Sequence, residues 1–291
     1  MSRNKIDGGT GLICLLGNPV TKSFSPQIQN IISSVMNVNL IYLNFEIEHN
    51  QLSKAIEGLR ALKVKGFNVT IPYKEKIIEL LDEISPEAKE IGAVNTVKME
   101  DGKLIGYNTD WLGYYEAKLT CTGKGFEGDS VLILGAGGAA KAIAICCLKN
   151  NCANIMIYNR TIEKAEELVN NLMKNYSGRV NFCSIDILNH VISHSTLIIN
   201  TTSAGNYSNV NLMPIGEEVP FKKGQIFSEI IYNPSETKLM KLAQSKGAFC
   251  FNGFEMLLQQ AIKSWEIWCN KKIELDKIEE IRSLIKETWT F

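Results

Sequence analysis

One lysine stands in a segment with a constrained backbone. Lys74 ends the run Gly66–Lys74, GFNVTIPYK, in which a short strand leads through a proline to an expected helix start. Asn95 in GAVNT and Asp110 in YNTD follow. A partly buried ammonium group can donate a proton to a developing alkoxide, and a carboxylate beside it can hold the ammonium or share the proton. These residue types could therefore transfer a proton through Lys74 and Asp110, with Asn95 and Thr70 orienting hydroxyl groups. Taken alone, the local pattern favours a surface lysine, because charged residues follow Lys74 directly.

Two serines, Ser23 and Ser25, flank Phe24 in KSFSP. In an extended segment, side chains two residues apart share a face. The two hydroxyls could therefore bind a carboxylate or a polyol together. The alternative, which the local pattern favours, is that Ser25 caps a helix with Pro26 in its first turn and that Ser23 is an ordinary loop residue.

A glycine-rich turn follows an apolar run in Leu132–Ala140, LILGAGGAA. Gly135 can make the tight turn, and Gly137 allows the backbone to approach a pyrophosphate at the N-terminus of the next helix. Ala140 replaces the third glycine of the usual fingerprint, which is a permitted variant. Glycines also serve plain packing, but a strand before the turn and a helix after it favour a dinucleotide site.

The end of the next expected strand indicates which dinucleotide binds. The chain has Asn159, Arg160 and Thr161 there, with Lys164 one turn later. An NAD enzyme usually has Asp or Glu at this point, whereas a guanidinium suits the 2′-phosphate of NADP. We therefore predict NADP rather than NAD. The alternative is that Arg160 is a solvated surface charge and Thr161 only a helix cap.

The elements that must position these groups alternate between strand and helix patterns. Apolar runs predict strands, and apolar residues at helical spacing predict helices. Asp101-Gly102 predicts a tight hairpin turn. The expected strands are Leu12–Leu16, Leu40–Phe45, Gly66–Val69, Val94–Met99, Leu104–Tyr107, Val131–Leu134, Asn154–Tyr158, Val180–Ser184, Leu197–Asn200 and Gln225–Ile231. One expected helix begins at Ser25 and Pro26. The other expected helices span Leu52–Leu62, Tyr73–Leu81, Gly138–Leu148, Ile162–Met173 and Phe254–Ile285.

The repeated strand–helix order argues for an α/β fold with a parallel, doubly wound, Rossmann-like sheet in its second half. A domain boundary is expected near Asp110–Gly128. The last helical segment could cross back to the first domain. We therefore expect a substrate domain at 1–110 plus 255–291 and a dinucleotide domain at 111–254.

Bulk composition excludes several classes of protein. The chain has 291 residues, 31 basic and 31 acidic, and 45% hydrophobic residues, which suits about two globular domains. This balance does not favour nucleic-acid binding, and no apolar stretch is long enough to cross a membrane. The eight cysteines form no C-x-x-C motif and are expected to be reduced thiols of a cytoplasmic protein. His190 and His194 lie four apart without an acidic third ligand, so we predict no metal.

Together and in this order, these segments resemble the shikimate dehydrogenase family. The resemblance spans nearly the whole chain and rests on GNPVTKSFSP, NVTIPYK, GAVNT, YNTD, GAGGAAKA, NRT, IINTTSAGN, IIYNPSETKLM and GFEMLLQQA. It implies two α/β domains with a cleft between them. It also implies reversible, NADP-linked reduction of 3-dehydroshikimate to shikimate, a step of aromatic amino-acid biosynthesis. The implied partner is a small-molecule substrate, with a homodimer left open.

The resemblance implies a role for each matched residue, beginning with Lys74 and Asp110 as the catalytic pair. The substrate residues that it implies are Ser23, Ser25, Thr70, Asn95, Tyr232 and Gln260. The cofactor residues that it implies are Gly135, Ala136, Gly137, Gly138, Ala139, Asn159, Arg160, Thr161, Lys164, Thr201 and Gly253.

The chain departs from the family pattern at three positions. Asn206 stands where methionine is common, Thr201 replaces alanine, and Glu229 replaces aspartate. None of these changes removes a catalytic group.

Two alternative functions remain: a relative that also accepts quinate or uses NAD, and a catalytically silent member that regulates a partner. The presence of both Lys74 and Asp110 argues against the silent member.

Overall fold

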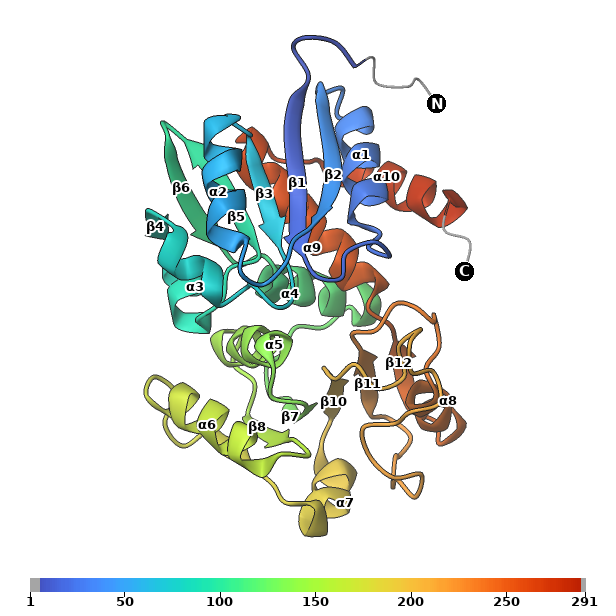
Figure 1. Cartoon of the computed structure of the whole chain (residues 1–291). Coiled ribbons are helices and arrows are strands. Elements are labelled where there is room, and N and C mark those ends of the chain that lie inside the picture. The colour runs from blue at the N-terminus through green and yellow to red at the C-terminus, as the bar shows by residue number, and fades with distance from the viewer. Residues whose placement is uncertain (1–5, 289–291) are drawn as a thin grey trace. The chain divides into compact units, whose positions relative to one another are not determined.

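The computed structural model describes residues 6–288, and the chain within them forms two compact units. One unit runs to Thr109 and resumes at Leu258, and the other runs from Asp110 to Leu257. The second crossing falls inside one helix, α9 (Phe254–Cys269), three residues later than the boundary expected from the sequence. Each unit is an α/β layer structure with its own sheet (Figure 1).

The first unit contains a mixed six-stranded sheet in the order β2-β1-β3-β5-β6-β4. Strands β1, β2 and β3 are parallel, whereas β5 runs antiparallel to both β3 and β6. The strands are β1 Gly11–Gly17, β2 Leu40–Glu46, β3 Gly66–Val69, β4 Glu83–Ile84, β5 Thr96–Glu100 and β6 Lys103–Tyr107. The helices are α1 Ser25–Val35, α2 Leu52–Ala61, η1 Lys76–Leu80, α3 Pro86–Ile91, most of α9, and α10 Leu275–Thr288.

A tight hairpin joins β5 to β6, as the sequence predicts. Asp101 and Gly102 have φ angles of 48° and 80°. Positive φ at both central residues is the mark of the two-residue hairpin turn whose twist matches that of the strands. The hairpin matters for the site because residues Ala93–Thr96 and Tyr107–Thr109 are held side by side at its open end.

The second unit contains a six-stranded sheet that is parallel throughout, in the order β12-β11-β10-β7-β8-β9. The chain builds outward from β7 to β9 and then returns to the other side of β7 with β10. This is the doubly wound arrangement with a switch point between β7 and β10, where ligands bind at the carboxyl ends of the strands. The strands are β7 Ser130–Leu134, β8 Asn154–Tyr158, β9 Val180–Phe182, β10 Leu197–Asn200, β11 Ile226–Glu229 and β12 Phe249–Phe251. The helices are α4 Asp110–Thr122, α5 Gly138–Lys149, α6 Ile162–Met173, α7 Ile185–His194 and α8 Lys238–Ser245.

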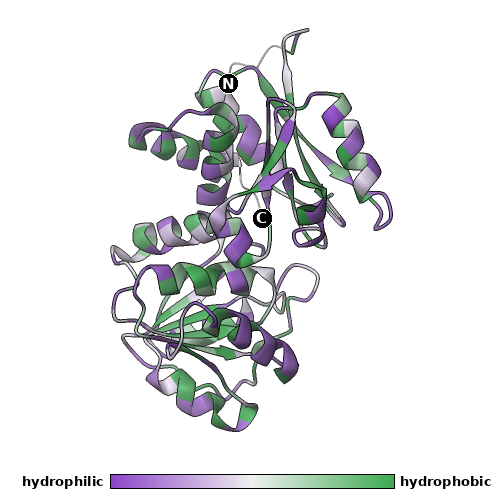
Figure 2. Cartoon of the chain, turned by 90° about the vertical axis from the view of Figure 1, so that its left-hand side faces the viewer, coloured by the Kyte–Doolittle hydropathy of each residue, from purple (hydrophilic) through white to green (hydrophobic). Residues whose placement is uncertain are grey.

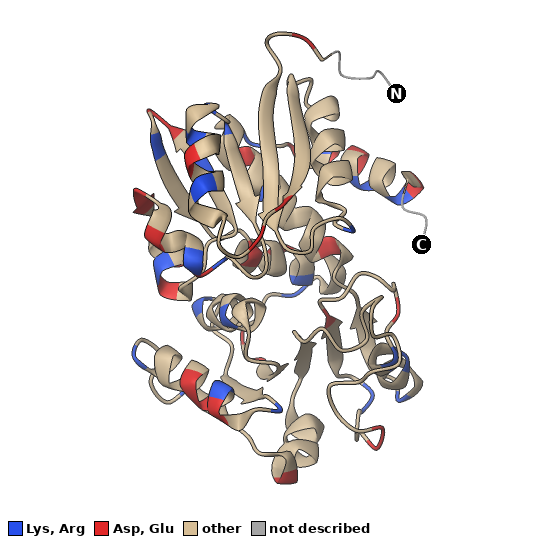
Figure 3. Cartoon of the chain, in the orientation of Figure 1, with Lys and Arg blue, Asp and Glu red and all other residues tan. Residues whose placement is uncertain are grey.

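Apolar side chains are concentrated on the central strands of each unit. Val131, Leu132, Ile133 and Leu134 of β7 are all fully buried, as expected for a parallel strand with helices on both faces. Figure 2 shows hydrophobic residues along the strands and a mixture of hydrophobic and hydrophilic residues along the helices. Charged residues of both signs are mixed over the helices and loops (Figure 3). No helix within residues 6–288 is long and apolar enough to cross a membrane.

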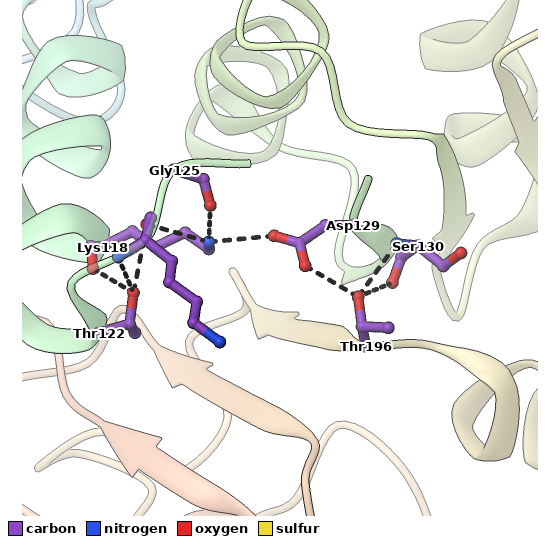
Figure 4. A network of polar contacts seen from close by, with 7 residues as sticks. Lys118, Thr122, Gly125, Asp129, Ser130 and Thr196 are labelled. Carbon is purple, nitrogen blue, oxygen red and sulfur yellow. Dashed lines mark hydrogen bonds and ion pairs between the residues drawn. The ribbon is translucent and has the colours of Figure 1, made fainter. Parts of the chain in front are cut away.

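A buried lysine anchors the start of the second unit. The Lys118 ammonium, on α4, pairs with Asp129 Oδ2 at 3.0 Å and donates to the carbonyl of Gly125 (Figure 4). It also lies 4.6 Å from the centroid of the Phe126 ring. The other Asp129 oxygen accepts a hydrogen bond from Thr196 at 3.0 Å. The network thus ties α4 to the loop before β7 and to the residue before β10.

Several expected elements differ in the structure. Ser25 is not the helix cap: Phe24 occupies that position, and Ser25 is already helical. The helix expected over Tyr73–Leu81 is instead the short 3₁₀ helix Lys76–Leu80, followed by extended backbone at Leu81. Strand β9 is two residues shorter than predicted.

Other elements were missed or merged. Helix α4 occupies most of the segment where only a boundary was expected. Its buried residues follow helical spacing, but they include Asp110, Gly113 and Lys118, so hydrophobicity alone does not reveal the stripe. The long C-terminal helix is two helices, α9 and α10, separated where Asn270 takes a φ of 48°. Besides α4, the elements for which no prediction was made are α3, α7, α8, β4 and β12.

Candidate functional site

The backbone on both sides of Lys74 is held in place. Tyr73 is fully buried, and its hydroxyl donates to the Ile47 carbonyl at 2.6 Å. The Lys74 carbonyl accepts from Val94 N at 2.7 Å. The Lys74 side chain is half-buried. The lysine is therefore presented from a fixed loop that is hydrogen-bonded to the residue preceding Asn95.

Asn95 is buried at the open end of the β5–β6 hairpin. Its Oδ1 accepts from Thr109 N at 2.8 Å and from Thr96 Oγ1 at 3.0 Å, and its Nδ2 donates to Thr109 Oγ1 at 3.0 Å. Asn108 Nδ2 bonds the carbonyl of Ala93 at 3.0 Å. The two Asn-Thr segments are thus locked to one another, which fixes the chain up to Thr109.

Asp110 follows Thr109 directly and opens helix α4. Its side chain is buried, and a carboxylate in the first turn is favoured by the helix dipole. Lys74 belongs to one compact unit and Asp110 is the first residue of the other. Their pairing therefore stays a prediction, supported by the bonds from Lys74 to Val94 and from Asn95 to Thr109.

Ser23 and Ser25 bring their hydroxyls together, although the segment is a turn and not extended. Phe24 between them has φ −83° and ψ −4°. The two Oγ atoms are 3.1 Å apart, and Ser25 N donates to Ser23 Oγ at 3.2 Å. Both residues are half-buried. Two adjacent hydroxyls can both donate to one carboxylate, which suits the predicted role.

The glycine-rich loop has the shape that a dinucleotide requires. Gly135 has a φ of 112°, and a Cβ there would lie 2.5 Å from Thr201 Oγ1. A Cβ at Gly137 or Gly138 would meet nothing within 4 Å, so the space in front of α5 is open. The first turn of α5 carries no acidic residue. These observations fit a pyrophosphate at the helix N-terminus, with Ala136 and Ala139 in the same loop.

The cationic end of β8 lies next to this loop. Gly135 N donates to the Tyr158 carbonyl at 2.7 Å, which places the strand end beside the first glycine. Asn159 Nδ2 bonds the Thr161 carbonyl at 2.8 Å and shapes the turn. Arg160 and Lys164 are exposed. Thr161 is the helix cap position but its side chain makes no capping bond. The exposed guanidinium fits a ribose 2′-phosphate.

Thr201 and Gly253 both have structural roles in the second unit. Thr201 Oγ1 donates to the Leu134 carbonyl at 2.7 Å and so links the end of β10 to the end of β7. A Cβ on Gly253 would lie 2.0 Å from the Ile230 carbonyl oxygen, so only glycine fits. Tyr232 is half-buried. Burial raises the pKa of its hydroxyl, and the neighbouring Tyr207 adds a smaller rise. Their contacts with a cofactor or substrate stay predictions.

A buried carboxylate joins three segments at the carboxyl end of the second sheet. Glu229 accepts from Asn200 Nδ2 at 3.0 and 2.9 Å, from Ile231 N at 3.1 Å and from Thr237 Oγ1 at 2.9 Å. Asn200 Oδ1 in turn accepts from Thr202 N and Oγ1. Burial raises the pKa of Glu229 to about 7, although the hydrogen bonds oppose this rise.

This raised pKa predicts a pH-dependent stability. The stabilisation is present below the ordinary pKa of 4.5 and is lost as the pH rises through about 7, because the unfolded chain has already released the proton. We expect the unfolding free energy of the wild type, relative to Glu229→Gln, to fall by about 3 kcal/mol between pH 5 and pH 8. Urea unfolding at several pH values measures this difference. A difference that stays flat or grows over that range contradicts the prediction.

Some polar residues of the region were missed by sequence reasoning. These are Tyr42, Asn68, Thr109 and Ser264, all buried and hydrogen-bonded to one another or to Asn95. The position of Thr109 beside Asp110 in YNTD was an available signal for that residue. Ser264 lies in an apolar helix and gives no local signal.

The described residues contain no arrangement of three or more His, Cys, Asp or Glu side chains suited to a metal ion. His190 and His194 pack ring to ring on α7, with centroids 4.2 Å apart. All eight cysteines lie within residues 6–288 and none forms a disulfide.

Known proteins resemble this chain over almost all of its length. A family model described as the shikimate dehydrogenase substrate binding domain matches residues 15–97, and one described as shikimate / quinate 5-dehydrogenase matches residues 118–212. Shikimate dehydrogenase (NADP(+)) of Alkaliphilus oremlandii is 39% identical over 274 residues, covering 93% of this chain and 96% of that protein.

Two solved structures are similar in fold and sequence. A crystal structure of shikimate dehydrogenase in complex with NADP+ has a TM-score of 0.91 and 36% identity, covering 100% of both chains. Shikimate 5-dehydrogenase from Listeria monocytogenes, in complex with shikimate and NAD, has a TM-score of 0.87 and 33% identity, covering 95% of this chain and 98% of that one.

Proposed function

Because the chain belongs to the shikimate dehydrogenase family, we propose that it catalyses the NADP-dependent, reversible reduction of 3-dehydroshikimate to shikimate. The observation that carries the proposal is the hydrogen-bonded frame around Asn95, which fixes both the loop of Lys74 and the chain entering Asp110. We assign substrate binding to 1–110 plus 255–291 and cofactor binding to 111–254. The free cysteines suit a cytoplasmic location.

In the reduction, Lys74 supplies the proton. NADPH, when bound, provides the hydride that reaches the ring carbonyl carbon. Negative charge then grows on the carbonyl oxygen, and the Lys74 ammonium donates a proton to it, which leaves a hydroxyl group and a neutral amine. Asp110 holds the ammonium and accepts a hydrogen bond from the substrate. Oxidation of shikimate runs the same transfers in reverse.

The remaining groups orient the substrate. The adjacent hydroxyls of Ser23 and Ser25 donate to the ring carboxylate. Thr70, Asn95 and Gln260 bond the ring hydroxyls. Tyr232 is assigned to the same substrate. A substrate that is held at several points loses its freedom to turn before reaction, and this raises the rate of hydride transfer.

The cofactor residues divide into three groups. The loop residues Gly135, Ala136, Gly137, Gly138 and Ala139 take the pyrophosphate at the start of α5. The cationic end of β8 binds the 2′-phosphate through Asn159, Arg160, Thr161 and Lys164. The nicotinamide end is assigned to Thr201 and Gly253.

An absorbance assay at the nicotinamide band tests the proposal directly. Purified protein is given shikimate or quinate, each with NADP or NAD. We expect the highest kcat/KM with shikimate and NADP. A higher kcat/KM with quinate, or with NAD, would favour the alternative of an enzyme that uses quinate or NAD. The assay includes NAD because the structure of the Listeria monocytogenes relative contains NAD. No reaction with any pair would overturn the proposal.

Arg160→Asp should change the cofactor preference. Replacing the guanidinium with a carboxylate removes the partner of the 2′-phosphate and adds repulsion, so we expect KM for NADP to rise at least about tenfold while KM for NAD changes little. Lys174→Asp, at the exposed far end of α6, is the matched control and should leave the ratio of the two KM values unchanged. An unchanged ratio in Arg160→Asp would show that this residue does not contact the cofactor.

A further inference from the structure

Ser264 lies at the centre of a buried polar network in the first unit. It is in α9, one helical turn after Gln260, and its hydroxyl donates to the Gln260 carbonyl at 2.9 Å. Its Oγ is also 2.8 Å from Thr96 Oγ1 and 3.1 Å from Thr109 Oγ1. Ser264 thus links the helix that carries Gln260 to the strand ends that hold Asn95.

Asn68 extends the network across the sheet. Its Nδ2 lies within hydrogen-bond distance of the Asn95 carbonyl at 2.9 Å, Thr96 Oγ1 at 3.0 Å and Ser264 Oγ at 3.3 Å. Because Thr96 Oγ1 also bonds Asn95 Oδ1 at 3.0 Å, both the backbone and the amide of Asn95 are held. The amide therefore cannot turn without breaking several buried bonds.

Tyr42 lies at the end of the network opposite Ser264. Its hydroxyl donates to Asn68 Oδ1 at 2.7 Å. Tyr42 is itself buried, so this bond is shielded from water. The chain of contacts accordingly runs from Tyr42 through Asn68 to Ser264.

We propose that Ser264 and Tyr42 are positioning residues for the substrate, which hold Asn95 and Gln260 in one fixed arrangement before the substrate binds. The inference rests on the proposed function, since it takes those two residues to contact the substrate. Neither Ser264 nor Tyr42 needs to touch the substrate. A buried network in which every member has a partner is rigid, and a prearranged site loses less entropy on binding.

Ser264→Ala tests the proposal, with Ser33→Ala as the matched control. Ser33 is also buried in the first unit, and its Oγ accepts from Trp265 Nε1 at 3.2 Å, so it is a neighbouring serine outside this network. Both variants lose a buried hydroxyl and should lower the urea midpoint. Only Ser264→Ala should raise KM for shikimate, by about five- to tenfold, the equivalent of one to two buried hydrogen bonds. kcat should stay within about twofold, and KM for NADP should not change.

Tyr42→Phe is an independent arm at the other end of the network. It keeps the ring that packs against Trp268 and removes only the hydroxyl that bonds Asn68. It should also raise KM for shikimate. An unchanged shikimate KM in both Ser264→Ala and Tyr42→Phe, or an equal rise in Ser33→Ala, would overturn the inference.

The wild type separates failure of this inference from failure of the proposed function. If the wild type turns over shikimate with NADP while the variants keep its KM, only the positioning role fails. If the wild type shows no turnover, the proposed function fails, and calorimetric binding of shikimate to the same variants then tests the positioning role. Equal shikimate affinity in wild type and Ser264→Ala would overturn it there as well.

Discussion

Lys74→Ala should lower kcat by at least ~10², because the positioned proton donor for the developing alkoxide is lost. KM for shikimate should change little, since the serines, Asn95 and Gln260 still hold the ring. Initial rates in both directions at saturating NADP or NADPH measure the two constants. An affinity loss with turnover retained would instead mean that Lys74 only binds the substrate.

Lys76→Ala is the matched control for this result. Lys76 is exposed two residues later, at the first position of η1, and has no assigned role. Its replacement should leave kcat and KM unchanged.

A double-mutant cycle of Lys74→Ala and Asp110→Asn tests whether Lys74 and Asp110 act as a pair. Residues that act as a unit show strongly non-additive losses. Fully additive losses would separate the two residues.

Lys118→Ala should lower the unfolding free energy of the protein by about 3–5 kcal/mol. Lys118 is 1% exposed and its partner Asp129 is 17% exposed, so removing the ammonium leaves a carboxylate with little access to water. The change also removes the donor to the Gly125 carbonyl and the cation above the Phe126 ring. Urea unfolding followed by circular dichroism measures the loss.

The chain provides a matched surface pair as the control for Lys118. Lys103 and Glu83 are 2.7 Å apart, and their side chains are 60% and 52% exposed. Solvent screens such a pair, so Lys103→Ala should lower the unfolding free energy far less than Lys118→Ala does. Equal losses in the two variants would mean that burial does not decide the strength of the Lys118 pair.

Much of the fold was readable from local patterns. Strands Gly66–Val69, Asn154–Tyr158 and Leu197–Asn200 and helix Ile162–Met173 have the predicted bounds. The two-residue turn after β5 was also predictable, because positive φ at both positions favours residues such as Asp and Gly. Family membership, the two-sheet α/β class and the NADP assignment were likewise reached from motifs.

Other elements depend on contacts between distant residues. Helix α4 was hidden because a carboxylate, a glycine and a lysine lie on its buried side. Lys118 is buried there only because Asp129 and the carbonyl of Gly125 surround it. No local rule predicts that partner.

Residue type and spacing were sufficient to nominate the reacting groups, since a lysine, a carboxylate, paired serines and a glycine turn carry their chemistry within a few neighbouring residues. Folding established what those residues touch. Ser23 and Ser25 meet through a turn, Glu229 gathers donors from three segments, and Ser264 bonds residues more than 150 positions earlier in the chain. The physical reason is that hydrogen bonding and burial depend on distance in space, whereas the order of residues constrains only near neighbours.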